Sequence, residues 1–274
     1  MRSRDMLLIG LMAGTLNMTT ASASERYFTY TYEPETMPQG VTEFEQWVTL
    51  RTQKKVDEGT PVDNFNRWEL REEFEYGVTD NYSASLYLNT SAESFRDATT
   101  GDDHSDFQFD GVSIENRYMV LNPAEHPVGL ALYLEPRYSG DQAEIEEKII
   151  LGQRVGDWKW AFNLVHATEW TDNLHSTEGE VEADFGLTRR LNKSWSLGFE
   201  LRDHNELPDY HFWENTAVFI GPVVTYTQEK WWATLTVMPQ VYGNNFQDNP
   251  DGDHGFDLEG HERVNVRLIV GFTL

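Results

Sequence analysis

Apolar and polar residues alternate along most of the chain with a period of two. Around Trp68 and Leu70, apolar side chains alternate with arginine and glutamate, and from Val264 to Leu274 every second residue is apolar. Side chains that alternate in this way point to opposite sides of a β-strand. No helical periodicity is sustained beyond the first 23 residues, so the pattern predicts an all-β protein.

The alternation divides into about 12 segments, each bounded by turn residues. Most are longer than the strands of soluble proteins, which average about 5–6 residues. They suit a tilted strand that crosses a bilayer, which needs about 9–11 residues. The predicted fold is therefore a single antiparallel up-and-down transmembrane β-barrel. The candidate strands lie near residues 41–54, 64–78, 82–96, 108–122, 129–140, 143–155, 158–171, 177–190, 194–206, 214–227, 230–243 and 261–274.

The connections between these segments differ in character. Tight turns are predicted at residues 79–81 and 156–157, whereas residues 96–106, 207–212 and 243–260 form longer polar loops. Short turns at one end and longer loops at the other are typical of outer-membrane barrels, in which the short turns face the periplasm. An even number of strands places both termini on that side.

Aromatic residues provide a second indication of a membrane. Several fall on apolar faces within a few residues of a predicted short connection, and aromatic rings at one level form the interfacial girdle of a membrane barrel. The alternative is that these rings belong to the core of an ordinary soluble protein. The predicted girdle residues are Tyr76, Tyr82, Tyr118, Trp158, Trp160, Trp195, Tyr226, Trp231 and Phe272.

The N-terminus has the pattern of a secretory signal. Arg2 and Arg4 precede a short apolar run, and Ala21-Ser22-Ala23 follows it as a small-residue cleavage site. The run is too short for a membrane anchor. We therefore predict a signal peptide over residues 1–23 and a barrel over residues 24–274.

The composition excludes several classes of protein. With 46 acidic and 21 basic residues, the net charge is -25, which disfavours binding to nucleic acid. Aromatic residues make up 13% of the chain, whereas disordered segments are poor in them. Cysteine is absent, which excludes disulfides, thiolate metal sites and cysteine nucleophiles.

Two short segments share a motif that ends in a predicted turn. Residues 75–81 read Glu-Tyr-Gly-Val-Thr-Asp-Asn and residues 185–191 read Phe-Gly-Leu-Thr-Arg-Arg-Leu. Both resemble a pattern in transporter barrels of the phenol-degradation meta-pathway type and in related uncharacterised barrels. The C-terminus resembles the terminal signal of Gram-negative outer-membrane β-barrels, although its last residue is Leu274 rather than an aromatic. The resemblance implies an outer-membrane location and brings no catalytic or substrate-binding residues with it.

If the apolar face contacts lipid, the charged face lines the lumen, where both signs of charge can pair across strands. Two interpretations remain open. The charges form a selective constriction in a narrow channel or passive uptake porin for a small polar or charged solute. Alternatively, Arg–Glu networks fill the plugged lumen of a non-transporting barrel with a structural or surface-interaction role. The lumen and selectivity candidates are Arg51, Arg67, Glu69, Arg71, Glu73, Glu75, Glu115, Arg117, Glu135, Arg137, Glu182, Asp184, Glu200, Arg202, Arg263 and Arg267; of these, replacing Arg71 or Arg117 is expected to alter selectivity.

No enzymatic activity is predicted. The carboxylates are too numerous to single out an acid–base pair. His166 and Thr168 share an apolar face. Outer-membrane phospholipases, which have similar barrels, use a lipid-facing His and Ser, but the serine position here is Thr168. We expect His166 to be an interfacial residue.

Neither a cofactor nor a bound metal is predicted, although the acidic residues of the long loops offer weak candidates for a divalent cation at Asp248, Asp251 and Asp253. Their spacing does not match a calcium-binding EF-hand, and solvated acidic loops are the more ordinary interpretation. The expected partners are outer-membrane lipid, lipopolysaccharide, the barrel-assembly machinery and a small solute. The barrel is expected to be a monomer.

Overall fold

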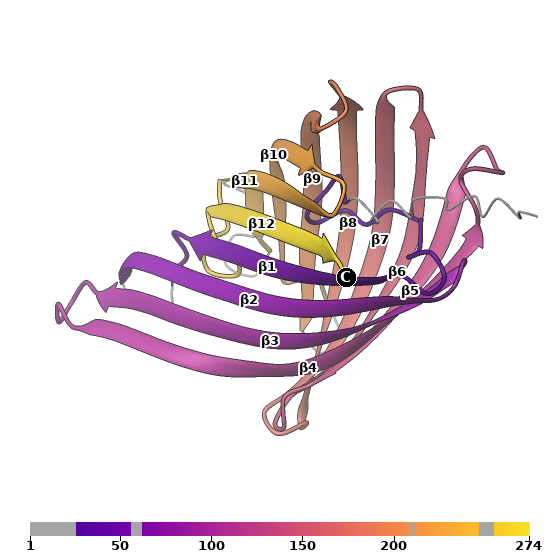
Figure 1. The fold of residues 1–274 in the computed structure, drawn as a ribbon. Coiled ribbons are helices and arrows are strands. Elements are labelled where there is room, and N and C mark those ends of the chain that lie inside the picture. The colour runs from indigo at the N-terminus through magenta and orange to yellow at the C-terminus, as the bar shows by residue number, and fades with distance from the viewer. Residues whose placement is uncertain (1–25, 56–61, 209, 211, 247–254) are drawn as a thin grey trace, which may run out of the picture.

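The computed structural model describes residues 26–55, 62–208, 210, 212–246 and 255–274. These residues form twelve β-strands (Figure 1). Among them, no helix is long and apolar enough to cross a membrane. The strands are β1 Thr42–Thr52, β2 Val62–Thr79, β3 Tyr82–Asp97, β4 Asp103–Leu121, β5 Gly129–Tyr138, β6 Ala143–Val155, β7 Trp158–Thr171, β8 Ser176–Arg190, β9 Trp195–Pro208, β10 Asn215–Thr227, β11 Trp231–Asn245 and β12 Val264–Thr273.

The strands form one closed antiparallel barrel. Each strand pairs with its neighbours in the chain, and β1 pairs with β12 to close the sheet. Along β1 the register is regular, and Trp47 lies opposite Ile269 of β12 on one side and Arg71 of β2 on the other. Closure pairs both edges of the sheet, as a lipid environment requires. The part of β4 before Val112 extends beyond the end of β5 and pairs only with β3. The predicted all-β barrel of about 12 strands is confirmed, and each predicted segment coincides with one strand.

The two ends of the barrel are named here by their connections. The turn end holds both termini of the barrel and the connections at residues 80–81, 122–128, 156–157, 191–194 and 228–230. The loop end holds the connections that follow β1, β3, β5, β7, β9 and β11.

One predicted loop is mostly strand. Residues 96–106 were expected to form a long loop, but β3 and β4 continue through this region and leave only residues 98–102 between them. The extension is held by an ion pair between Arg96 and Asp103, at 2.8 Å, and by stacking of Phe95 on His104. Phe95 and His104 lie opposite each other in the ladder, and cross-strand pairs of this kind stabilise a hairpin.

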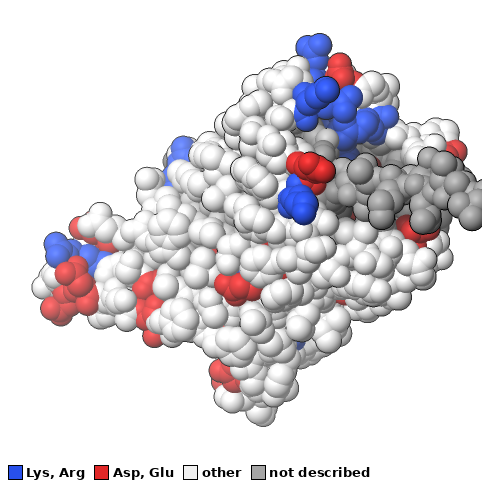
Figure 2. Space-filling view, viewed as in Figure 1, with Lys and Arg blue, Asp and Glu red and all other residues white. Residues whose placement is uncertain are grey.

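The outer face of the barrel is largely apolar. Side chains such as Phe74 and Leu86 are about half exposed, and Figure 2 shows a broad uncharged band, with charged residues gathered mainly toward the ends of this face. Neighbouring rings contact each other at the turn end, where the ring centroids of Trp195 and Tyr226 are 4.7 Å apart. The residues predicted to form a girdle all lie on the outer face near this end: Tyr76, Tyr82, Tyr118, Trp158, Trp160, Trp195, Tyr226, Trp231 and Phe272.

The described part of the chain before β1 lies largely inside the barrel. Residues 26–39, called the inner segment below, lie in the turn-end half of the lumen, form no strand and lead into β1 (Figure 1). Every residue from Arg26 to Pro34 is buried. The predicted signal peptide, residues 1–23, lies outside the described residues.

Candidate functional site

The inner segment is held at its centre by one carboxylate of the barrel wall. Glu200 of β9 is fully buried and accepts hydrogen bonds from the backbone N–H groups of Thr29, Tyr30 and Thr31, at 3.0, 2.8 and 2.9 Å. The Thr29 hydroxyl donates to the same carboxylate at 3.1 Å. Buried backbone donors need a partner. Here the Glu200 carboxylate provides the hydrogen-bond acceptors that the backbone carbonyl groups of a neighbouring strand would otherwise provide.

Other wall side chains complete this pairing. The amide of Asn163 accepts a hydrogen bond from the Tyr32 N–H, at 2.6 Å, and donates one to the Tyr32 carbonyl, at 2.9 Å. The Thr234 hydroxyl donates to the carbonyl of Arg26 at 2.6 Å. The segment is therefore bonded to β7, β9 and β11, which lie on one side of the barrel.

Aromatic side chains of the inner segment pack against apolar residues of the lumen. Phe28 packs with Ala161 and Val223, and Tyr32 packs within a cluster that includes Trp47 and Trp232. These contacts bury apolar surface inside the barrel, which stabilises the segment in the lumen. The lumen face is therefore not uniformly charged. This differs from the interpretation of the sequence, in which a charged face lines the lumen.

Glycines of the wall make room for the segment at its closest approaches. A Cβ added at Gly186 of β8 would lie 2.5 Å from Cδ1 of Phe28. At Gly152 of β6, the added atom would lie 2.8 Å from Cδ of Pro34. A side chain at either position would collide with the segment as it now lies.

Charged groups of the inner segment also pair with the wall. Arg26 lies 3.4 Å from Glu45, and its guanidinium stacks over the Tyr32 ring. Lys159 of β7 contacts Glu35 at 3.0 Å and Glu33 at 3.8 Å. Burial raises the pKa of Glu33 above its usual value. Burial acts on Glu35 too, but there the Lys159 ammonium outweighs it and lowers the pKa.

Beyond the inner segment, the lumen widens into a cavity of about 790 Å³. Tyr30 and Tyr32 contribute to its lining where it meets the inner segment, and Lys54 and Glu259 contribute at the loop end. Acidic residues outnumber basic ones along its wall. The molecule therefore holds a charged cavity in the loop-end half of the barrel and a packed segment in the turn-end half.

The structure divides the predicted lumen residues into three groups. Five lie buried outside the cavity lining, namely Glu73, Glu75, Glu115, Arg117 and Glu200. Arg263 precedes β12, stacks over the Phe256 ring and is not part of the lining. The remaining candidates all line the cavity: Arg51, Arg67, Glu69, Arg71, Glu135, Arg137, Glu182, Asp184, Arg202 and Arg267.

Ion pairs join many of these residues across strands. Arg51 of β1 lies 2.9 Å from Glu69 of β2, and Arg202 of β9 donates from Nε to Glu182 of β8 at 2.9 Å. Below the cavity, Arg117 contacts Glu75 at 2.8 Å. Because Arg117 does not border the cavity, we no longer expect its replacement to alter selectivity directly.

The outer face near the loop end has a small polar cluster. His166 Nδ1 lies 3.6 Å from a carboxylate oxygen of Glu147. Tyr210 packs beside the His166 ring, and its hydroxyl contacts Thr168. The interpretation of His166 as an interfacial residue stays a prediction.

A second cluster, at the loop end of the lumen, was not predicted from the sequence. His204 and Glu206 of β9 lie near His261, which belongs to the segment before β12. Burial keeps the pKa of His261 well below its usual value. The weak metal candidates of the sequence, Asp248, Asp251 and Asp253, lie outside the described residues.

The contact between Gly186 and Phe28 gives a direct test of the inner segment. We expect Gly186→Leu to displace the segment, because overpacking of this kind costs about 1–3 kcal/mol, and to increase ion conductance in planar bilayers several-fold. Adding Phe28→Ala should return the conductance toward the wild-type level, since it leaves room for the leucine. Gly255→Leu is the control, because nothing lies within 4 Å of its added Cβ. Equal conductance in Gly186→Leu and wild type would show that the contact does not hold the segment.

The sequence matches the family of unknown function DUF6662 over residues 20–148 and 156–274. The chain belongs to this family. A comparison with curated proteins found no match. The family description assigns no activity.

Solved structures with the same fold are outer-membrane barrels. The COG4313 outer membrane channel from Pseudomonas putida F1 has a TM-score of 0.61 at 13% identity, covering 90% of this chain and 100% of the channel. The beta domain of the Bordetella autotransporter BrkA has a TM-score of 0.55 at 9% identity, covering 85% and 99%. The NanC porin has a TM-score of 0.51 at 11% identity, covering 85% and 100%. At these identities the likeness concerns the fold, which is that of porin-like outer-membrane β-barrels. The narrower resemblance to meta-pathway-type barrels stays a prediction.

Proposed function

We propose that this protein is a narrow outer-membrane channel that admits a small polar or charged solute from its loop end, with the inner segment restricting passage at the turn end. The observation that carries the proposal is the charged cavity of about 790 Å³ that ends on the inner segment. In this orientation the loop end faces outward and the turn end faces the periplasm, as in other outer-membrane barrels.

Several features support this assignment. The apolar outer face and its aromatic girdle suit contact with outer-membrane lipid and lipopolysaccharide. A barrel of this size lies between the eight-stranded barrels filled by side chains and the open porins of 16 strands. The solved structures that share the fold include a channel and a porin, and neither is described as an enzyme. We further propose insertion by the barrel-assembly machinery and a monomeric state.

The packed inner segment also favours a second candidate function. If the segment seals the lumen completely, the protein is a non-transporting barrel with a structural or surface-interaction role. The cavity would then bind a solute without conducting it. Conductance distinguishes the two candidates.

The charge of the cavity predicts its ion selectivity. We expect the purified protein to show a small conductance in planar bilayers and a reversal potential that favours cations, because acidic residues dominate the lining. Arg71→Gln removes a positive charge from the cavity wall and should strengthen the preference for cations. Arg96→Gln is the matched control, because Arg96 pairs with Asp103 away from this cavity. No conductance in any salt would overturn the channel proposal and favour the sealed barrel.

A further inference from the structure

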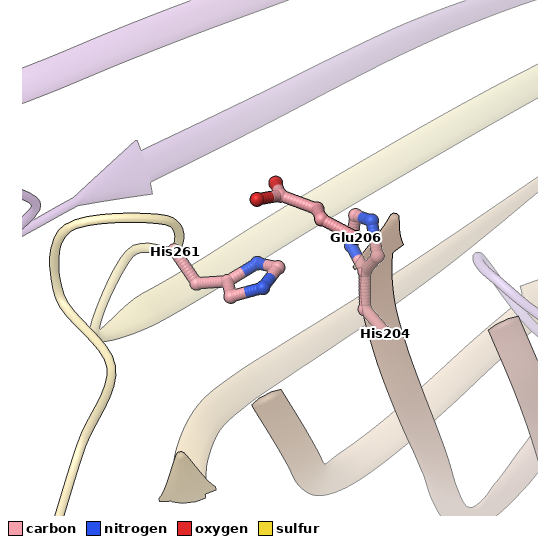
Figure 3. Close-up of side chains that lie close together, drawn as sticks. All are labelled: His204, Glu206 and His261. Carbon is pink, nitrogen blue, oxygen red and sulfur yellow. The ribbon is translucent and has the colours of Figure 1, made fainter. Parts of the chain in front are cut away.

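Two buried histidines meet at the loop end of the lumen. His204 and Glu206 project from β9, and His261 faces them from the segment before β12 (Figure 3). The ring centroids of the two histidines are 4.7 Å apart. His204 is 5% exposed and His261 is 2% exposed, so both rings have left bulk water. One nitrogen of each histidine and one carboxylate oxygen of Glu206 lie within 4.8 Å of one another.

Both ring nitrogens of His204 face carboxylates of β8. Nε2 lies 3.3 Å from a Glu180 oxygen and Nδ1 lies 3.7 Å from a Glu182 oxygen. These contacts are ion pairs only when the imidazole is protonated. In the neutral imidazole one nitrogen keeps a lone pair that faces a carboxylate, and a bound cation would supply the missing positive charge.

Asn215 of β10 orients the other two side chains. Its side-chain oxygen lies 2.9 Å from Nε2 of His261, and its amide nitrogen donates to Glu206. When His261 donates from Nε2 to this oxygen, its Nδ1 keeps a lone pair. A hydrogen bond from the far nitrogen of an imidazole, which fixes the ring and its tautomer, is the usual arrangement around a metal-binding histidine.

We infer that His204, Glu206 and His261 bind a divalent transition-metal ion of the Zn²⁺ type at the loop end of the lumen. Two imidazoles and one carboxylate are ligands that Zn²⁺ accepts, with bonds of about 2.0–2.2 Å and a fourth position left for water. Ca²⁺ and Mg²⁺ prefer sites made of oxygen atoms alone. One candidate ligand atom from each of the three residues already lies within 4.8 Å of the other two.

The position of the site suggests what the ion would do. β9 and β12 are separated by two strands in the barrel, so the ion would tie the segment that carries His261 to the wall at β9. His204, Glu206 and His261 all border the charged cavity. A bound ion would therefore fix the entrance to the cavity and add positive charge there. This inference rests on the side-chain cluster and not on the proposed channel activity.

The test is Zn²⁺ binding by the folded, detergent-solubilised full-length barrel, measured by calorimetry. We expect one saturable site, whose affinity falls about 10- to 100-fold or more in His204→Ala and in His261→Ala, as loss of a metal ligand predicts. His166→Ala is the matched control, because His166 lies on the outer face, and it should leave the affinity unchanged. Heat-modifiable mobility on gels establishes that each variant has formed the barrel.

Co²⁺ provides a second measurement that needs no variant. Bound to the wild-type protein by two imidazoles and a carboxylate, it should give the visible absorption of a tetrahedral or five-coordinate site, and Zn²⁺ should remove that absorption. Absence of both the Zn²⁺ site and the Co²⁺ spectrum would overturn the inference. Equal Zn²⁺ affinity in the His204→Ala His261→Ala double variant, or full competition by Ca²⁺, would also overturn it and assign binding to acidic groups elsewhere.

Discussion

Replacing Glu200 with alanine is expected to release the inner segment and to increase the conductance of the barrel several-fold. The Glu200 carboxylate accepts hydrogen bonds from three consecutive backbone N–H groups, those of Thr29, Tyr30 and Thr31. The alanine would leave these donors buried and unpaired, at a cost of about 1–3 kcal/mol each. Such a penalty weakens the attachment of the segment to the barrel wall. The measurement is single-channel conductance in planar bilayers.

Two further variants separate this effect from a general loss of charge. Glu200→Gln keeps one acceptor oxygen in place and should give an intermediate conductance. Glu93→Ala removes a carboxylate from the cavity wall without touching the segment, so it should change selectivity more than conductance. If Glu200→Ala conducts like the wild type, the carboxylate does not anchor the segment.

The barrel could be predicted from the sequence because each strand separates lipid from lumen. The alternation from Val264 to Leu274, for example, follows from Val266 and Leu268 facing outward while Arg267 and Ile269 face inward. The ends of the strands were harder to predict where polar residues extend the hydrogen-bonded ladder beyond the alternating segment. The extension of β3 and β4 past Arg96 depends on its pairing with Asp103, a contact that no periodicity reveals.

The inner segment could not be predicted in the same way. Its backbone is paired with the side chains of Glu200 and Asn163 rather than with a neighbouring strand, so it carries no alternating pattern of its own. The sequence does contain one signal of the inner segment, in the glycines of the two short motifs. In the motifs at residues 75–81 and 185–191, the glycines are Gly77 and Gly186, and both are positions where an added Cβ would collide with the inner segment.

The histidine cluster was missed for a different reason. His204 stands in a strand whose inward face also carries Glu200, Arg202 and Glu206, so it reads as one more polar lumen residue. His261 lies outside any strand and reaches His204 across β10 and β11, where it contacts Asn215. No spacing in the sequence links the two residues.

The central claim is that the inner segment restricts a charged lumen, and single-channel conductance with and without residues 26–36 tests it most directly. The account predicts a small, cation-selective conductance for the barrel that keeps these residues and a several-fold larger one for the shortened chain. In the shortened chain, Glu200→Ala should add no further increase, because groups that act through one contact are not additive. Equal conductance in the two chains, once both have been shown to form heat-modifiable barrels, would contradict the account.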